Sequence, residues 1–263
     1  AEISGTVKVD GLDVNTAGPE ELRRLRGESV GLIFQDPMTR LDPLQRIGDH
    51  LVETMRAHRP ETSGAEARRL AGLALREVGI PLGRARQYPH ELSGGMRQRV
   101  MIALAVLLRP PVIVADEPTT SLDVLVEAQI LDLIDDLRQR LGTALLLVTH
   151  DLAVVAERCD RVAVMVAGSV VEVGPATTVF ENPRHPYTKI LLASRVSLTS
   201  ERLSPGQDAE HPSAASSSAR RHSGCPFASR CPEAIELCYG LAPELEAVED
   251  TLVACHLASP ARR

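Results

Sequence analysis

The sequence contains no apolar run long enough to cross a membrane. Its longest uninterrupted apolar stretch lies between Arg99 and Arg109, and this is far short of the roughly 20 residues that a transmembrane helix requires. The first residues also lack the basic segment and apolar run of a secretory signal. We therefore expect a soluble chain without a membrane-spanning segment.

The sequence also lacks a strong excess of charge of one sign. It has 29 basic and 35 acidic residues, mixed along the chain, and a net charge of −6. Nucleic-acid binding normally needs a clustered positive surface, so we expect no nucleic-acid partner. With 263 residues and 44% apolar content, the chain is long enough for a substantial core with an appendage.

Hydrophobic patterns predict an α/β fold. Apolar runs at residues 30–34, 112–115 and 144–149 are typical of buried strands, and the apolar spacing over residues 126–141 predicts a helix with one buried face. Between residues 47 and 108 the pattern is helical with several breaks. Buried strands that alternate with helices indicate a largely parallel sheet.

Composition divides the chain into six predicted segments. A polar, serine-rich stretch has the composition of a flexible linker, and a small cysteine-rich extension follows it. The segments are a partial core at 1–46, a helical subdomain at 47–110, the second half of the core at 111–180, a helical extension at 181–203, the linker at 204–223 and the C-terminal module at 224–263.

The most specific motif is Leu92-Ser93-Gly94-Gly95-Met96-Arg97-Gln98-Arg99, which opens an apolar helix. Free backbone N–H groups at a helix start, a serine hydroxyl and glycines that allow close approach suit a bound anion. The motif resembles the signature sequence of ABC ATPases, and this resemblance implies nucleotide contacts from Ser93, Gly94, Gly95 and Gln98. Alternatively, the serine and glycines form only a turn and an N-cap.

A second motif follows about twenty residues later. The sequence Val112-Ile113-Val114-Ala115-Asp116-Glu117-Pro118, continuing to Asp123, resembles a Walker B strand that runs into a D-loop. This resemblance implies that Asp116 helps to hold Mg²⁺ and that Glu117 faces the attacking water as general base. It also implies that Asp123 lies across a dimer interface. The alternative is that the acidic residues only end a strand and begin a turn.

Two single residues occur where the same family would place them. Gln35 resembles the Q-loop glutamine, which senses Mg²⁺ and the γ-phosphate, and His150 resembles the switch histidine, which contacts the γ-phosphate. Either residue alone would more often be an ordinary surface residue. The joint order of Gln35, Ser93, Glu117 and His150 favours the catalytic interpretation.

The resemblance implies the ATP-binding subunit of an ABC transporter. Such a subunit has a P-loop NTPase (RecA-like) core, binds ATP and Mg²⁺, and pairs head to tail with a second ATP-binding subunit as a homodimer or heterodimer. Transmembrane permease subunits supply the path, and an extracytoplasmic solute-binding protein acts indirectly. The chain is then expected at the cytoplasmic face of the cell membrane, as a peripheral protein.

Two proline-containing segments indicate which class of ABC transporter the chain resembles. Residues 35–43 and 181–188 are similar to segments of the ATP-binding subunits of oligopeptide, dipeptide and nickel importers. The implied solute is therefore a peptide or a similar compound. Because the ATP-binding subunit does not itself select the solute, this assignment rests on analogy.

A phosphate loop of the form G-x-x-x-x-G-K-[ST] occurs nowhere in the sequence. The lysines, Lys8 and Lys189, lie in no such context, and an aromatic residue to stack on adenine is also missing. The chain begins at Ala1 without a methionine, so we expect an N-terminally truncated ATPase with impaired hydrolysis. The alternatives are a non-hydrolysing partner that supplies only the signature face, and a soluble ABC-type ATPase of DNA repair.

Four of the five cysteines lie near the C-terminus, at Cys225, Cys231, Cys238 and Cys255. They can hold a [4Fe–4S] cluster or a zinc ion, or remain unligated thiols, whereas disulfides are disfavoured in a cytosolic chain. Resemblance to the C-terminal extension of peptide-importer ATPases favours the [4Fe–4S] cluster. Cys159 stands alone on an apolar helix face and is expected in the core.

Overall fold

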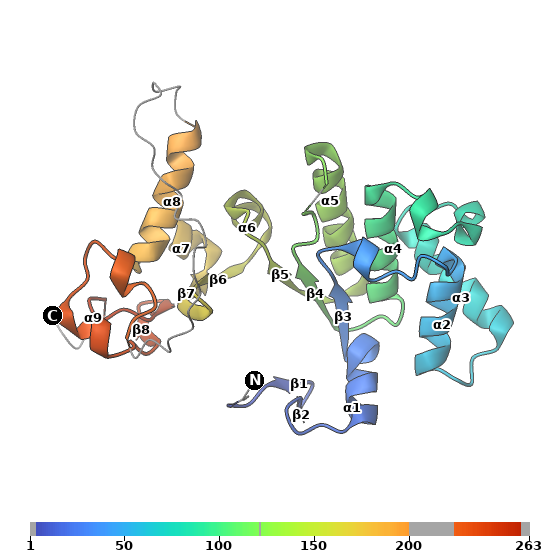
Figure 1. The fold of residues 1–263 in the computed structure, drawn as a ribbon, viewed down its shortest axis with the longest axis horizontal. Helices are drawn as coiled ribbons and strands as arrows, with labels where there is room; N and C mark the ends of the chain where they lie inside the picture. Colours follow the sequence, from blue (N-terminus) through green and yellow to red (C-terminus); the bar gives the residue numbers. More distant parts are fainter. Residues whose placement is uncertain (1–3, 121, 200–223, 259–263) are drawn as a thin grey trace. The chain divides into compact units, whose positions relative to one another are not determined.

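The computed structural model describes residues 4–120, 122–199 and 224–258. The chain forms two compact units, Ala1–His150 and Asp151–Arg263, whose elements are labelled in Figure 1. Each unit has its own sheet and its own apolar core.

The first unit is built on a three-stranded parallel sheet. Its strands stand in the order β3 (Val30–Ile33), β4 (Val112–Asp116) and β5 (Ala144–Val148). The register pairs Ile33 with Ala115 and Asp116 with Val148, so the carboxyl ends of the three strands meet at one edge. The preceding elements are an antiparallel hairpin of β1 (Lys8–Val9) and β2 (Leu12–Asp13), then α1 (Pro19–Arg24) and a π-helical turn (Leu25–Ser29).

Capping side chains set where the helices of this unit begin. Ser63 accepts the Glu66 N–H at 3.2 Å at the start of α3, and Asp123 accepts the Val126 N–H at 3.0 Å at the start of α5. Gly142 ends α5 with a φ of 64°, a left-handed cap that glycine adopts without strain. The helices are α2 (Ile47–His58), α3 (Gly64–Glu77), α4 (Gly94–Val106) and α5 (Val124–Leu141), with 3₁₀ turns at Pro37–Thr39, Leu82–Arg86 and Pro89–Glu91.

The two faces of the parallel sheet are covered differently. On one face, α4 and α5 share a core with the alternate side chains of β3 and β4. Gly31 allows this close packing, because a Cβ there would lie 2.2 Å from the carbonyl oxygen of Ala105 in α4. The opposite face carries apolar side chains that stay exposed, at 39% for Leu32, 57% for Leu146 and 46% for Val148.

The second unit holds a four-stranded antiparallel sheet in the order β6-β7-β9-β8. A two-residue turn joins β6 (Arg161–Val166) to β7 (Ser169–Pro175), and both turn residues have positive φ, as a type I′ turn requires. The other elements are α6 (Leu152–Arg158), α7 (Ala176–Glu181), α8 (Pro186–Thr199), a 3₁₀ turn (Ala228–Arg230), α9 (Glu236–Gly240), β8 (Glu246–Val248) and β9 (Thr251–Val253). No helix in the described part of the chain is long and apolar enough to cross a membrane.

The structure confirms the α/β character and corrects two finer expectations. The sheet of the first unit is parallel, as expected for the core, but the other described strand pairs, including the hairpin of β6 and β7 within the predicted core, are antiparallel. The cysteine-rich extension does not stand apart, because β9 pairs with β7 and joins the sheet of the second unit. The linker predicted at 204–223 lies outside the described residues, and the six-segment division stays a prediction.

Candidate active site

The predicted catalytic residues lie at the carboxyl edge of the parallel sheet. Gln35 lies two residues beyond the end of β3, Glu117 directly follows β4, and His150 lies two residues beyond the end of β5. Because the three strands are parallel and in register, these positions stand side by side. Ligands of open α/β sheets bind outside this edge, which makes it the candidate active site.

Glu117 has an unusual backbone conformation. Its φ is 47°, in the left-handed region that non-glycine residues seldom adopt, and its N–H donates to the carbonyl oxygen of Val148 at 2.9 Å. The chain then turns, with Pro118 in the second position, and the Thr120 N–H donates to the Glu117 carbonyl oxygen at 3.2 Å. Such strained conformations persist where the surrounding structure holds them, and they cluster at active sites.

The Glu117 carboxylate contacts two donors. His150 Nδ1 lies 2.8 Å from Oε1 and 2.9 Å from Oε2, and Thr120 Oγ1 donates to Oε2 at 2.5 Å. Partial burial raises the pKa of Glu117, but the hydrogen bonds from Thr120 and His150 and the charge of the histidine outweigh burial, so the net pKa is lowered. The carboxylate is therefore ionised at neutral pH and can accept a proton.

The turn after Glu117 is tied to the first turn of α5. Thr119 Oγ1 donates to Glu127 Oε1 at 2.7 Å. Asp123, which the sequence predicts at a dimer interface, is exposed and caps the same helix. Its capping role is visible within one chain, and its role between two subunits stays a prediction.

The predicted signature residues lie at the start of α4. Ser93 is the N-cap, and its hydroxyl accepts a first-turn backbone N–H at 3.4 Å, so the simple capping role is present. The two glycines face the start of α5. A Cβ at Gly94 would lie 3.5 Å from Leu122, whereas a Cβ at Gly95 would lie only 2.6 Å from Val126. Packing within one chain therefore requires glycine at position 95.

The remaining predicted nucleotide contacts differ in accessibility. Gln35 and Asp116 are exposed, as residues that meet Mg²⁺ or a phosphate must be. Gln98 is only 1% exposed. Gln98 is buried on α4 within this chain, and its contact with a nucleotide stays a prediction.

The C-terminal cysteines do not form a metal site in this structure. Within residues 224–258 and the other described ranges, no group of three or more His, Cys, Asp or Glu side chains could hold an ion. Burial raises the pKa of the Cys231 and Cys255 thiols, and nearby cysteines act in the same direction, whereas metal ligation needs thiolates.

The cysteines instead take part in packing. The Cys225 N–H donates to the Cys238 carbonyl oxygen at 2.8 Å, and Cys225 and Cys231 pack against the apolar core of the second unit. The predicted [4Fe–4S] or zinc ligation is therefore unsupported. Cys159, expected in the core, is half-buried and forms the C-cap of α6.

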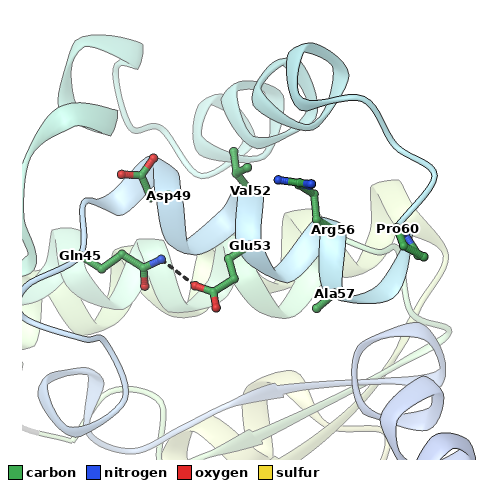
Figure 2. A pocket seen from close by; sticks show the side chains of 7 residues that line it. All are labelled: Gln45, Asp49, Val52, Glu53, Arg56, Ala57 and Pro60. Carbon is green, nitrogen blue, oxygen red and sulfur yellow. Dashed lines mark hydrogen bonds between the residues drawn. The ribbon is translucent and has the colours of Figure 1, made fainter.

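A separate pocket opens along α2 (Figure 2). Gln45 Nε2 donates to Glu53 Oε2 at 2.7 Å there, and Asp49 and Arg56 also line the pocket. None of the residues at the carboxyl edge of the sheet lines it. The pocket is thus distinct from the candidate active site.

Sequence analysis missed two polar features. One is Thr120, whose hydroxyl reaches Glu117 only because of the turn between them. The other is a buried group in the second unit, where the Glu172 carboxylate accepts the N–H groups of Arg184 at 2.8 Å and His185 at 3.0 Å. These bonds fix the chain at the entry to α8 and give segment 181–188 a structural role.

Comparison with known proteins shows the family of the chain. Residues 1–120 match the ABC transporter family, and residues 171–238 match the oligopeptide/dipeptide transporter C-terminal region. The oligopeptide transport ATP-binding protein OppD of Escherichia coli is 44% identical over 259 residues, which cover 96% of this chain and 74% of that protein. The chain belongs to the ABC transporter ATP-binding family. OppD of Salmonella typhimurium is 45% identical, over 93% of this ABC chain and 72% of the relative.

A solved ABC cassette shares the fold. The dimeric cassette MJ0796, in a post-hydrolysis state bound to ADP and Pi, aligns with a TM-score of 0.58 and 30% identity over 66% of this ABC chain and 74% of its own. In this chain, the exposed Asp116 carboxylate beside Glu117 suits Mg²⁺ held through its water shell. The sequence contains no G-x-x-x-x-G-K-[ST] motif to cradle the β- and γ-phosphates.

Proposed function

We propose that this ABC chain is an ATP-hydrolysing subunit that powers the import of peptides or similar solutes. The contact between Glu117 and His150 at the carboxyl edge of the sheet carries the proposal. An ionised carboxylate, an imidazole and an exposed aspartate at one edge are the groups that hydrolytic phosphoryl transfer needs. Similarity to the OppD proteins supports the peptide assignment, which rests on analogy.

Glu117 is the general base in this proposal. Its carboxylate accepts a proton from the attacking water while the water oxygen bonds to the γ-phosphorus and the bond to the bridging oxygen breaks. His150 Nδ1 contacts both carboxylate oxygens, so the attacking water has to replace it at one of them. His150 would then contact the γ-phosphate, and Gln35 and Asp116 would hold Mg²⁺, which would neutralise charge on the phosphates.

The phosphate loop is supplied by sequence outside these 263 residues in this proposal. The sequence contains no such motif, and it spans 72% to 74% of the OppD relatives. Parallel sheets are normally covered on both faces, and a helix follows a phosphate loop. One face of the parallel sheet exposes Leu32, Leu146 and Val148, and a helix packed there would bury these apolar side chains. Residues 1–263 alone are then expected to hydrolyse ATP poorly.

The proposed partners are those of an ABC importer. A second ATP-binding subunit, identical or different, pairs with this one, so that Ser93 and Gly94 act on the nucleotide held by the other subunit. The dimeric structure of MJ0796 supports such pairing. Permease subunits supply the path and place the chain at the cytoplasmic face of the membrane, and a solute-binding protein delivers the solute from outside.

A second candidate is a non-hydrolysing partner that lends only its signature face. The missing phosphate loop favours this candidate, whereas the ordered contact between Glu117 and His150 favours hydrolysis. The upstream coding sequence decides between them. An in-frame phosphate loop supports hydrolysis, and a stop codon directly upstream supports the non-hydrolysing partner.

The functional test uses the protein extended upstream through its phosphate loop and assembled with its permease subunits in proteoliposomes. ATP hydrolysis and peptide uptake are both expected in the wild type, and both are expected to fall in Glu117→Gln. The matched control is Glu66→Gln, an exposed glutamate that pairs with Arg69, and it should change neither. Absence of hydrolysis contradicts the ATPase assignment, and hydrolysis without peptide uptake contradicts the solute class.

A further inference from the structure

The turn that follows β4 folds Thr120 back onto the carboxylate of Glu117. The Thr120 N–H donates to the Glu117 carbonyl oxygen at 3.2 Å, and the Thr120 hydroxyl donates to Glu117 Oε2 at 2.5 Å. Pro118 restricts the backbone between them and is buried. One short turn thus binds both the main chain and the side chain of the same glutamate.

The same turn is anchored on its far side. Thr119 Oγ1 donates to Glu127 Oε1 at 2.7 Å, and Glu127 belongs to α5, an 18-residue helix that buries Ile130 and Ile134 in the core. Because the helix is fixed by this packing, the hydrogen bond from Thr119 limits movement of the turn. The Thr120 hydroxyl is therefore held in place from both directions.

The two donors on Glu117 differ in how firmly they are held. The His150 side chain is 79% exposed, and in the proposed reaction it leaves the carboxylate to contact the γ-phosphate. Thr120 lies on the same turn as Glu117 and does not have to move. It is the donor that can still orient the carboxylate while Glu117 receives a proton from water.

We propose that Thr120 is a positioning residue for the general base, because its hydroxyl fixes the rotation of the Glu117 carboxylate. The hydrogen bond between Thr119 and Glu127 holds the turn that carries Thr120 in place. This inference rests on the proposed function, since it assigns Thr120 a part in the reaction of Glu117. The hydroxyl is the group that matters, so serine can replace threonine at this position and valine cannot.

The first experiment measures steady-state ATP hydrolysis in the extended protein. Thr120→Val is expected to lower kcat roughly tenfold, the effect of one lost hydrogen bond to a charged group, with an unchanged KM for ATP. Thr120→Ser should stay within about twofold of the wild type, and Thr119→Val should show a smaller loss than Thr120→Val. The matched control is Thr54→Val, which removes a hydroxyl bond to the His50 carbonyl oxygen in α2 and should leave kcat unchanged.

The second experiment uses the chain of residues 1–263 and does not depend on ATP hydrolysis. With ¹³C-labelled glutamate at pH 8, the Glu117 carboxyl resonance is identified by its loss in Glu117→Gln. Thr120→Val is expected to move this resonance, whereas Thr120→Ser and Thr54→Val should leave it in place. If Thr120→Val does not fold, as judged by circular dichroism, Thr120→Ala takes its place in both experiments.

The outcomes separate this inference from the proposed function. If Glu117→Gln leaves hydrolysis unchanged, the proposed function fails, and the carboxyl resonance still reports whether Thr120 holds Glu117. If Glu117→Gln abolishes hydrolysis while Thr120→Val keeps the wild-type kcat, only the role of Thr120 is overturned. An unmoved carboxyl resonance in Thr120→Val, or a serine variant as slow as the valine variant, overturns it as well.

Discussion

His150 Nδ1 and Glu117 Oε1 lie 2.8 Å apart, and this contact joins the carboxyl ends of β5 and β4. The two residues are 33 positions apart in the sequence, and the parallel register of the strands brings them together. The Glu117 carboxylate, the proposed base, therefore has an ordered partner within the chain. Such preorganisation lowers the cost of assembling a catalytic site during the reaction.

Replacing His150 by glutamine in the extended protein is expected to lower ATP turnover at least 10²-fold, the lower end of the range for a positioned acid–base group. Glutamine cannot carry the positive charge that the imidazole can offer to a phosphate. The matched control is His90→Gln, because His90 is exposed and stacks on Tyr88 away from Glu117. If His150→Gln hydrolysed ATP as fast as His90→Gln, His150 would have no part in the reaction.

Gly95→Ala is expected to destabilise the chain by about 1–3 kcal/mol, the usual cost of overpacking. The new Cβ would lie 2.6 Å from Val126 Cγ1, whereas the Cβ of Gly94→Ala would lie at an ordinary 3.5 Å from Leu122. Urea denaturation followed by circular dichroism should therefore separate the two variants. Adding Val126→Ala to Gly95→Ala should recover part of the loss, and equal stability of the two glycine variants would contradict this packing.

Acidification is expected to weaken the second unit through His185. This histidine is 1% exposed, and burial, followed by the charge of Lys189, lowers its pKa from 6.5 to about 4. The ring nitrogen Nδ1 accepts the Tyr187 N–H at 3.0 Å, which protonation of that nitrogen would abolish. Between these two pKa values the unfolded chain binds a proton that the folded chain does not.

Because the unfolded chain binds more protons in this range, the stability of the folded chain falls as the pH falls. The contribution of His185 is fully present above pH 6.5 and is lost as the pH falls toward 4, by up to about 3 kcal/mol. Chemical denaturation at pH 7, 5.5 and 4.5 should show the loss in the wild type. His185→Gln is expected to be less stable at pH 7 and to show a weaker pH dependence, and an unchanged pH dependence would exclude this histidine as the cause.

Much of the first unit could be predicted because its sequence patterns are local and strong. The apolar runs gave the three parallel strands, and residues that directly follow such strands necessarily share one edge. That rule places Glu117 and His150 at the same edge, and the pairing of β4 with β5, which the sequence did not predict, makes them neighbours. The capping role of Ser93 is equally local, since it depends on the residues of a single helix turn.

Other features depend on contacts that no local pattern contains. The strands β8 and β9 have three residues each, too few for a periodic signal, and β9 reaches β7 across most of the second unit. The burial of Gln98 depends on which elements surround α4. The hydrogen bond between Thr120 and Glu117 depends on a positive φ at Glu117. A positive φ at a non-glycine residue cannot be predicted from the sequence.

Single-turnover ATP hydrolysis by the extended protein with Glu117→Gln tests the role of the base most directly. Glutamine has nearly the same size as glutamate and can still meet His150, but it cannot accept the proton from water. The expected result is a fall in the rate of roughly 10²–10⁴-fold while ATP still binds. A rate equal to that of the wild type, with the variant folded and ATP bound, would show that Glu117 is not the general base.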